Sequence, residues 1–315
     1  MRKAPDFASI FASRLKEYVA FMKENDRKFN VETTILRAFD RYVCENSITA
    51  ITEENVIGFT YSIPDLSKEQ YDKRHRIIRK FSDYLNLRQQ GETIRPLPKN
   101  RSSGRIIPYV YSNDELSLLL ETTKKLNPAP ALRPYTYYTM FGLLASTGLR
   151  VSEALNLDIS DVDLTNGVLK ISNTKFRKSR LVPVHASTLE VLREYDNLRR
   201  ELMPDQKDNA FFPGRNKSRL SYGTVNSTFL DVARTAGIRS AEGKGSRIHD
   251  LRHTFAIRRV AVWYDMELDI HQMLPLLSTF MGHAHFEDTT YYLSAGAELL
   301  AKGSSRFIKG GDSIG

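Results

Sequence analysis

The chain has 315 residues, of which 41% are hydrophobic and 26% are charged, a composition typical of folded globular proteins that excludes a disordered chain. It holds no apolar run of the roughly 18–20 residues that cross a bilayer, so we expect no membrane partner. The length predicts two domains, and the formal net charge of +9 favours a polyanionic partner.

The first ninety residues have the apolar spacing of consecutive helices. Asn30 is a candidate cap for the second helix, Thr52 opens a third, and Ser67 with Gln70 forms a capping-box pattern before a fourth. We expect the single cysteine, Cys44, to be a small buried residue on the second helix. One cysteine excludes an intramolecular disulfide and favours a cytoplasmic protein. The pattern predicts a small helical domain over residues 1–90.

Basic residues gather in the fourth predicted helix and in the segment after it. Residues 91–110 are rich in Gly, Pro, Ser and basic residues, which predicts an interdomain linker. A solvated helix face or a flexible spacer would give the same pattern. The candidate contacts to a phosphate backbone in these two segments are Arg74, Arg76, Arg79, Lys80, Lys99 and Arg101.

From residue 111 onward helical patterns resume, with one interruption. Ser112 and Glu115 form a second capping-box pattern, whereas residues 168–184 contain two β-prone runs around a polar, basic stretch. This predicts a β-hairpin between helical segments. The fold class we expect is mostly α with a small β-sheet or hairpin, in the α+β class.

Four motifs in this second part could carry chemistry. They are GLRVSE with Arg150, the hairpin turn with Lys175, HDLR with His249 and Arg252, and GH with His283, followed nine residues later by Tyr292. A histidine and an arginine three residues apart share one helix face and suit an anion. Cations of this kind also stabilise the anion of a phenol, which is otherwise a poor nucleophile.

A metal site is the alternative use of the histidines. His249 and His253 are four residues apart, and His283 and His285 could add ligands, as in a metal-dependent nuclease. The helical zinc pattern requires Glu directly after the first His, and Asp250 stands there. We therefore expect no metal site.

These motifs, in this order, resemble the tyrosine recombinase (phage integrase) family over residues 112–300 or so. The resemblance implies an N-terminal helical core-binding domain (1–90), a linker (91–110), a catalytic domain (111–300) and a tail (301–315). It implies that Tyr292 is the nucleophile, Tyr291 being its rival. Arg150, Arg252 and His283 would hold the phosphate, His249 would act as general base, and Lys175 as general acid with Lys178 as competitor.

The same resemblance implies a site-specific recombinase that cuts and rejoins DNA through a 3′-phosphotyrosine, without metal, ATP or another cofactor. Its partners would be double-stranded DNA with an inverted-repeat core site and further copies of the chain, from dimer to tetramer in synapsis. Arg177 and Lys178 would add DNA contacts, and Phe307 and Ile308 in the tail would dock on a neighbouring protomer. We expect an integrase or transposase of a mobile element in the nucleoid-associated cytoplasm. The alternatives are type IB topoisomerase-like relaxation and a non-catalytic DNA-binding relative.

Overall fold

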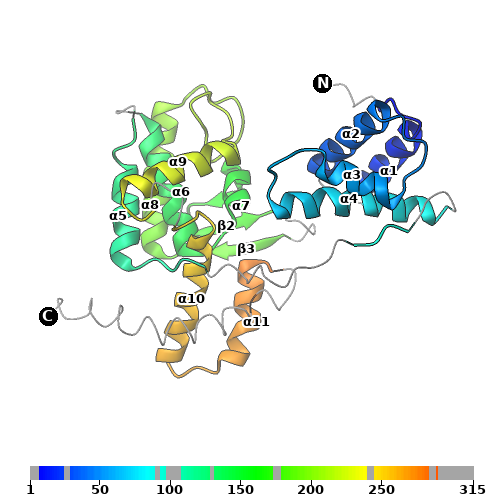
Figure 1. Cartoon of the computed structure of the whole chain (residues 1–315). Helices are drawn as coiled ribbons and strands as arrows, with labels where there is room; N and C mark the ends of the chain where they lie inside the picture. The colour runs from blue at the N-terminus through cyan, green and yellow to red at the C-terminus, as the bar shows by residue number, and fades with distance from the viewer. Residues whose placement is uncertain are drawn as a thin grey trace. The chain divides into compact units, whose positions relative to one another are not determined.

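The chain divides into two compact units, Met1–Gly104 and Arg105–Gly315 (Figure 1). The computed structural model describes residues 7–24, 29–88, 93–96, 108–127, 131–172, 179–239, 245–283 and 289. Across these residues, helices that are long and apolar enough to cross a membrane are absent. The domain boundaries expected above stay predictions.

The first unit is a helical bundle around one apolar core. Its helices are α1 (Ala12–Glu24), α2 (Asn30–Glu45), α3 (Glu53–Tyr61) and α4 (Lys68–Asn86). Phe39, Phe59 and Phe81 are fully buried side chains from α2, α3 and α4 and form the centre of the core. The helical spacing of apolar residues in the sequence therefore corresponds to the buried face of each helix.

Side-chain caps mark the starts of α3 and α4, whereas α1 and α2 begin directly after Phe11 and Phe29. The hydroxyl of Thr52 accepts from the N–H of Asn55, and Ser67 and Gln70 form a complete capping box. The predicted Asn30 cap is wrong, because Asn30 is the first helical residue and Phe29 precedes it without a side-chain cap. Cys44 is also corrected: it is exposed on the outer face of α2.

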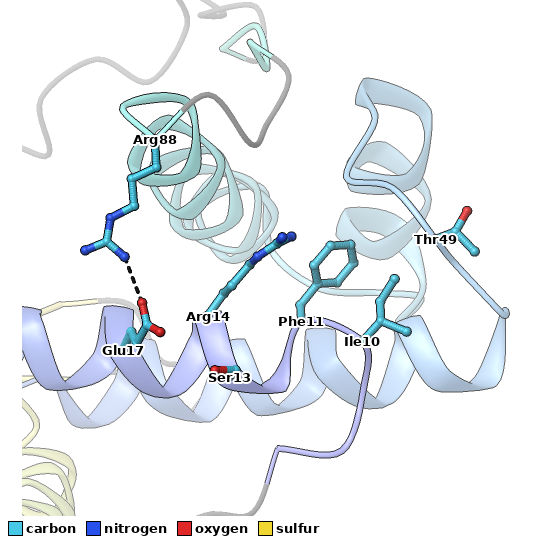
Figure 2. Close-up of a pocket in the computed structure, with 7 residues that line it drawn as sticks. All are labelled: Ile10, Phe11, Ser13, Arg14, Glu17, Thr49 and Arg88. Atoms are coloured by element: carbon cyan, nitrogen blue, oxygen red, sulfur yellow. Dashed lines mark hydrogen bonds and ion pairs between the residues drawn. The ribbon is translucent and has the colours of Figure 1, made fainter.

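A shallow depression lies where the start of α1 meets the end of α4 and the turn after α2 (Figure 2). Its volume is about 610 Å³, and Phe11, Arg14 and Thr49 are among its lining residues. Arg88 and Glu17 form an ion pair of 2.7 Å at its rim, with both side chains about half exposed. Such an exposed pair contributes roughly 0–1 kcal/mol. None of the predicted site residues lines this depression.

The second unit holds a helical core with a small sheet at one side (Figure 1). Its elements are α5 (Asn113–Thr123), α6 (Leu132–Thr147), α7 (Val151–Asn156), a 3-10 turn (Ile159–Asp161), β1 (Val162–Asp163), β2 (Val168–Ile171), β3 (Arg180–Pro183), α8 (Ala186–Leu202), α9 (Tyr222–Thr235), α10 (Asp250–Asp265) and α11 (Ile270–Met281). The mostly helical α+β prediction is confirmed.

The sheet has the strand order β1-β2-β3, and both pairings are antiparallel. Leu169 lies opposite Val182, and both side chains are buried in the main core of the unit. The register places Ile171, at the end of β2, opposite Arg180, at the start of β3. Ile171 and Arg180 are therefore the strand pair next to the turn of the hairpin that was predicted from the sequence.

Helices α10 and α11 pack against each other around a second, smaller core (Figure 1). Tyr111 fastens the segment before α5 to α10. Its N–H donates to the hydroxyl of Thr254, its carbonyl accepts from Arg258, and its own hydroxyl donates to the carbonyl of Arg247. The start of α10 is thereby held against the rest of the unit.

Candidate active site

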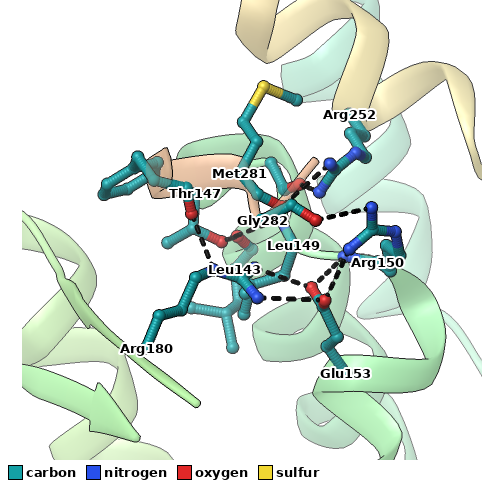
Figure 3. A network of polar contacts seen from close by, with 11 residues as sticks. Leu143, Thr147, Leu149, Arg150, Glu153, Arg180, Arg252, Met281 and Gly282 are labelled. Atoms are coloured by element: carbon teal, nitrogen blue, oxygen red, sulfur yellow. Dashed lines mark hydrogen bonds and ion pairs between the residues drawn. The ribbon is translucent and has the colours of Figure 1, made fainter. Parts of the chain in front are cut away.

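The carbonyl end of α11 gathers arginines from three different elements (Figure 3). The last carbonyls of a helix lack partners within it and carry its partial negative charge. Here the carbonyls of Phe280, Met281 and Gly282 accept from Arg180, Arg252 and Arg150, respectively, at 2.7, 2.9 and 2.9 Å. Three arginines that are far apart in the sequence thus meet at one point.

Arg150 directly precedes α7 and reaches the site from the side. One Nη donates to Glu153 Oε1 at 2.8 Å and the other to the carbonyl of Gly282. A guanidinium has five N–H donors, so three of them have no acceptor within the described part of the chain. The Arg150 side chain is 34% exposed, which leaves those donors accessible to an anion.

Arg252 lies in the first turn of α10 and is buried. Its Nη atoms donate to the carbonyls of Gly148 and Met281 at 2.6 and 2.9 Å. Gly148 is the C-cap of α6 and Met281 ends α11, so two helix C-termini stabilise this buried cation. Because the two carbonyls bind different Nη atoms, they fix the orientation of the guanidinium plane.

Glu153 and Arg180 lie behind Arg150. Arg180 forms a two-pronged pair with Glu153, at 3.1 and 2.9 Å, and its side chain is only 11% exposed. Burial acts to raise the pKa of Glu153, but the hydrogen bonds and charge of Arg180, followed by those of Arg150, outweigh it and lower the pKa. Glu153 is therefore a stable carboxylate between two arginines.

His249 directly precedes α10, three residues before Arg252, and is an exposed residue whose side chain makes no cap hydrogen bond. Its ring meets that of His253 edge-on, with centroids 4.8 Å apart. Desolvation by the surrounding protein, followed by the charge of Arg252, lowers the pKa of His249. The neutral imidazole at physiological pH can accept a proton.

His283 follows α11 directly. Gly282 ends the helix with φ +68°, and the N–H of His283 turns back to the carbonyl of Ser278. The Nδ1 of His283 lies 2.6 Å from the hydroxyl of Thr289. Burial, followed by the charges of Arg252 and Arg150, lowers the pKa of His283 to about 3. A neutral His283 beside two arginines fits a hydrogen-bonding role.

The structure brings together four of the predicted catalytic residues, Arg150, His249, Arg252 and His283. The remaining predicted side chains of the hairpin turn, the linker and the C-terminal part lie outside the described residues: Lys99, Arg101, Lys175, Arg177, Lys178, His285, Tyr291, Tyr292, Phe307 and Ile308. Their roles stay predictions.

The basic residues of α4 do not form a single class. Arg76 and Lys80 are exposed and Arg79 is half-buried. Arg74 is 6% exposed, lies over the ring of Phe59, and donates to the carbonyls of Phe59 and Thr60. The prediction of a DNA contact at Arg74 is therefore corrected: its guanidinium joins α4 to α3.

The alternative metal site would use His249, His253, His283 and His285, of which His285 lies outside the described residues. Within the described part of the chain, no three His, Cys, Asp or Glu side chains gather as metal ligands would. The acid next to His249 has a different use, because the buried carboxylate of Asp250 accepts from Arg247 at 2.7 Å. This pair secures the turn that enters α10.

Glu153 and Arg180 belong to the site but were not among the residues predicted for it. The sequence signal that could have identified these two residues was their position. Glu153 stands three residues after Arg150 at a helix start, and Arg180 is a charged residue at the base of a strand that packs on the core. Their convergence depends on the packing of β3 against the end of α11, which no local sequence pattern contains.

The chain is similar in sequence and in fold to known proteins. Residues 110–298 match the family model described as the phage integrase family. The integrase/recombinase y4rE of Sinorhizobium fredii is 38% identical over 97% of this chain and 98% of its own, and the tyrosine recombinase XerD of Oceanobacillus iheyensis is 27% identical over 90% and 86%. The structure of the XerH site-specific recombinase bound to palindromic difH substrate, a post-cleavage complex, aligns with a TM-score of 0.62 at 24% identity, covering 88% of this chain and 78% of that one.

Proposed function

The chain belongs to the phage integrase family and is a site-specific tyrosine recombinase, and we propose that it cuts and rejoins DNA through a covalent bond to Tyr292. The observation that carries this proposal is the convergence of Arg150, Arg252 and His283 at the carbonyl end of α11.

Arg150 and Arg252 bind the non-bridging oxygens of the scissile phosphate. Their planar forks match phosphate geometry. The carbonyl of Gly282 anchors Arg150, and the carbonyls of Gly148 and Met281 anchor Arg252. Negative charge grows on these oxygens when phosphorus becomes pentacoordinate. Donors that are already oriented toward it stabilise that state by several kcal/mol.

Tyr292 attacks phosphorus and passes its proton to His249. The P–O5′ bond breaks, the 5′-oxygen takes a proton from Lys175, and the 3′-phosphate remains on the tyrosine. His283 donates a hydrogen bond to the phosphate. Attack by a 5′-hydroxyl reverses these steps. Because the phosphotyrosine conserves the phosphodiester bond energy, the cycle requires no ATP, and the cationic side chains take the role that a metal has in other nucleases.

The DNA site in this proposal is an inverted repeat. XerH was captured on a palindromic substrate, and a two-fold DNA site is bound by two copies of a protein. Exchange between two such sites brings four copies into the synapsis. The exposed Arg76 and Lys80 and the half-buried Arg79 of α4 are proposed DNA contacts, together with the linker and hairpin cations named above.

We propose that the protein acts on a mobile element, which its similarity to integrase/recombinase relatives supports, and that it works in the nucleoid-associated cytoplasm, where its DNA substrate would lie. No observation favours a topoisomerase or a non-catalytic relative. The test is adduct capture. Fragments of the DNA that flanks the gene are incubated with the protein in EDTA, and DNA that stays attached to denatured protein is sequenced.

We expect an adduct on a site with inverted repeats, lost in Tyr292→Phe and retained in Tyr291→Phe. An adduct that depends on Tyr291 would move the nucleophile by one residue. Specific binding without an adduct would make the protein a non-catalytic relative. Cleavage that EDTA abolishes would favour a metal-dependent nuclease.

A further inference from the structure

Arg180 is placed where it can control Arg150 without touching the phosphate. It begins β3, donates from Nε to the carbonyl of Phe280 at 2.7 Å and donates from both Nη atoms to the carboxylate of Glu153. Its side chain is 11% exposed, against 34% for Arg150. Arg180 therefore supports the site from within the protein.

The carboxylate of Glu153 is saturated because Arg180 is present. Oε1 accepts from Arg150 Nη1 and Arg180 Nη1, and Oε2 accepts from the Arg150 backbone N–H and Arg180 Nη2. Two arginines and one carboxylate leave one positive charge. Without Arg180, Glu153 would neutralise Arg150 and could draw its guanidinium into a two-pronged pair.

Gly282 shows how closely Arg180 packs against the end of α11. A Cβ at position 282 would lie 2.6 Å from Nη1 and 2.8 Å from Cζ of Arg180. The same arginine begins the strand that follows the hairpin turn. One side chain thus joins the base of the hairpin, the helix start behind Arg150 and the segment before His283.

We propose that Arg180 is a positioning residue that binds Glu153 and the carbonyl end of α11, so that the positive charge of Arg150 is not offset by Glu153 and its guanidinium stays oriented for the scissile phosphate. The inference rests on the proposed function, because the role of Arg150 comes from it. Arg180 acts through Glu153, so its effect depends on the charge of that carboxylate and on the charge of the phosphate.

The test uses the full-length protein and the DNA site from adduct capture, as a nicked duplex, under single-turnover conditions. One duplex has a normal scissile phosphate and the other a methylphosphonate, in which a methyl group replaces one charged oxygen. We expect Arg180→Met to form adduct at least about tenfold more slowly on the phosphate, a change of about 1.4 kcal/mol. The loss of rate on the methylphosphonate should be smaller, because this substrate carries less negative charge for Arg150 to stabilise.

Arg219→Met is the matched control. Arg219 donates to the carbonyls of Leu155 and Leu157 and pairs with Asp158, so it supports the other end of α7. Its loss should slow both substrates by the same factor. If Arg180→Met also slows both equally, or slows neither, Arg180 has no positioning role.

A double variant tests the path through Glu153. Adding Glu153→Gln to Arg180→Met removes the unpaired carboxylate, and we expect it to recover part of the lost rate on the phosphate. A double variant that is slower than Arg180→Met would overturn the proposal. If Arg180→Met does not fold, Arg180→Lys is measured on the same two substrates. This variant keeps the positive charge but loses the two-pronged guanidinium, and it too should lose more rate on the phosphate than on the methylphosphonate.

Different results would overturn the proposed function and the role of Arg180. If the unmodified protein forms no Tyr292-dependent adduct on either duplex, the proposed function is wrong, and the role of Arg180 falls with it. If the unmodified protein forms the adduct and the Arg180 variants match the Arg219 control, only the role of Arg180 is wrong.

Discussion

Replacing Gly148 by alanine should destabilise the catalytic unit strongly, because two separate costs act at one position. Gly148 ends α6 with φ +63°, a left-handed conformation that costs a residue with a Cβ about 1–2 kcal/mol. The added Cβ would also lie 2.5 Å from Cδ1 of Phe255. That ring is buried and stacks on Phe280, so it has little room to move.

Overpacking of this kind costs about 1–3 kcal/mol, so the sum for Gly148→Ala is about 2–5 kcal/mol. The control is Gly237→Ala. Gly237 has φ +69° with nothing within 4 Å of an added Cβ, so only the backbone cost of about 1–2 kcal/mol applies. Both variants gain the same 0.4–1 kcal/mol or so from a less flexible unfolded chain, which cancels in the comparison.

The assay is urea unfolding followed by tryptophan fluorescence. The sequence has a single tryptophan, Trp263, which packs in the same small core as Phe255, so the signal reports on this unit. The steric argument predicts that Gly148→Ala loses at least about 1 kcal/mol more than Gly237→Ala. Equal losses in the two variants would refute it and would leave only the backbone conformation as the cause.

Three further predictions concern the site and the DNA. Gly282→Ala should slow adduct formation at least about tenfold, because the new methyl group displaces the Arg180 guanidinium; unchanged rates would show that Arg180 can move away without consequence. Lowered pKa values of His249, His253 (about 4) and His283 (about 3) mean that the folded chain binds fewer protons than the unfolded one below pH 6.5. The free energy of unfolding should therefore fall as the pH is lowered from 7 to 5.5, by at most about 1.4 kcal/mol per histidine and less where solvent reaches the ring, and a flat urea series would contradict the shifts. DNA affinity should fall steeply with salt, with a log–log slope near −0.9 per phosphate contacted, as measured by fluorescence anisotropy; a slope near zero would exclude phosphate contacts by the basic residues of α4, the linker and the hairpin turn.

Much of the fold could be predicted from local patterns because local physics determines it. Apolar spacing gave the buried faces of the N-terminal helices, and the capping boxes at Ser67 and Ser112 gave two helix starts. The same patterns gave wrong predictions for two residues of α2. Asn30 has the side chain of a cap, yet the helix already includes it, and the hydroxyl of Thr34 donates to its carbonyl. Cys44 lies one residue beyond the buried Val43 and so faces solvent.

Charge alone could not separate binding residues from structural ones. Arg74 and Arg76 stand two positions apart in one basic block, and the sequence treats them alike. Their places on α4 differ by about 200°, so Arg74 faces α3 and Arg76 faces solvent. Which arginine meets a carbonyl and which meets water depends on the packing of the neighbouring helix.

The site shows why its motifs contain glycines beside the arginines. Gly148 and Gly282 each end a helix in the left-handed conformation, and the carbonyl of each accepts from an arginine of another motif. The sequence displays the donors Arg150 and Arg252, but the acceptors are backbone atoms and leave no trace in it. Because helix ends present carbonyls in fixed directions, guanidinium groups bound to them are oriented before any phosphate arrives. Stabilisation of a pentacoordinate phosphorus is largest when the donors need no rearrangement, so the glycine helix ends are as much a part of the phosphate site as the arginines that they hold.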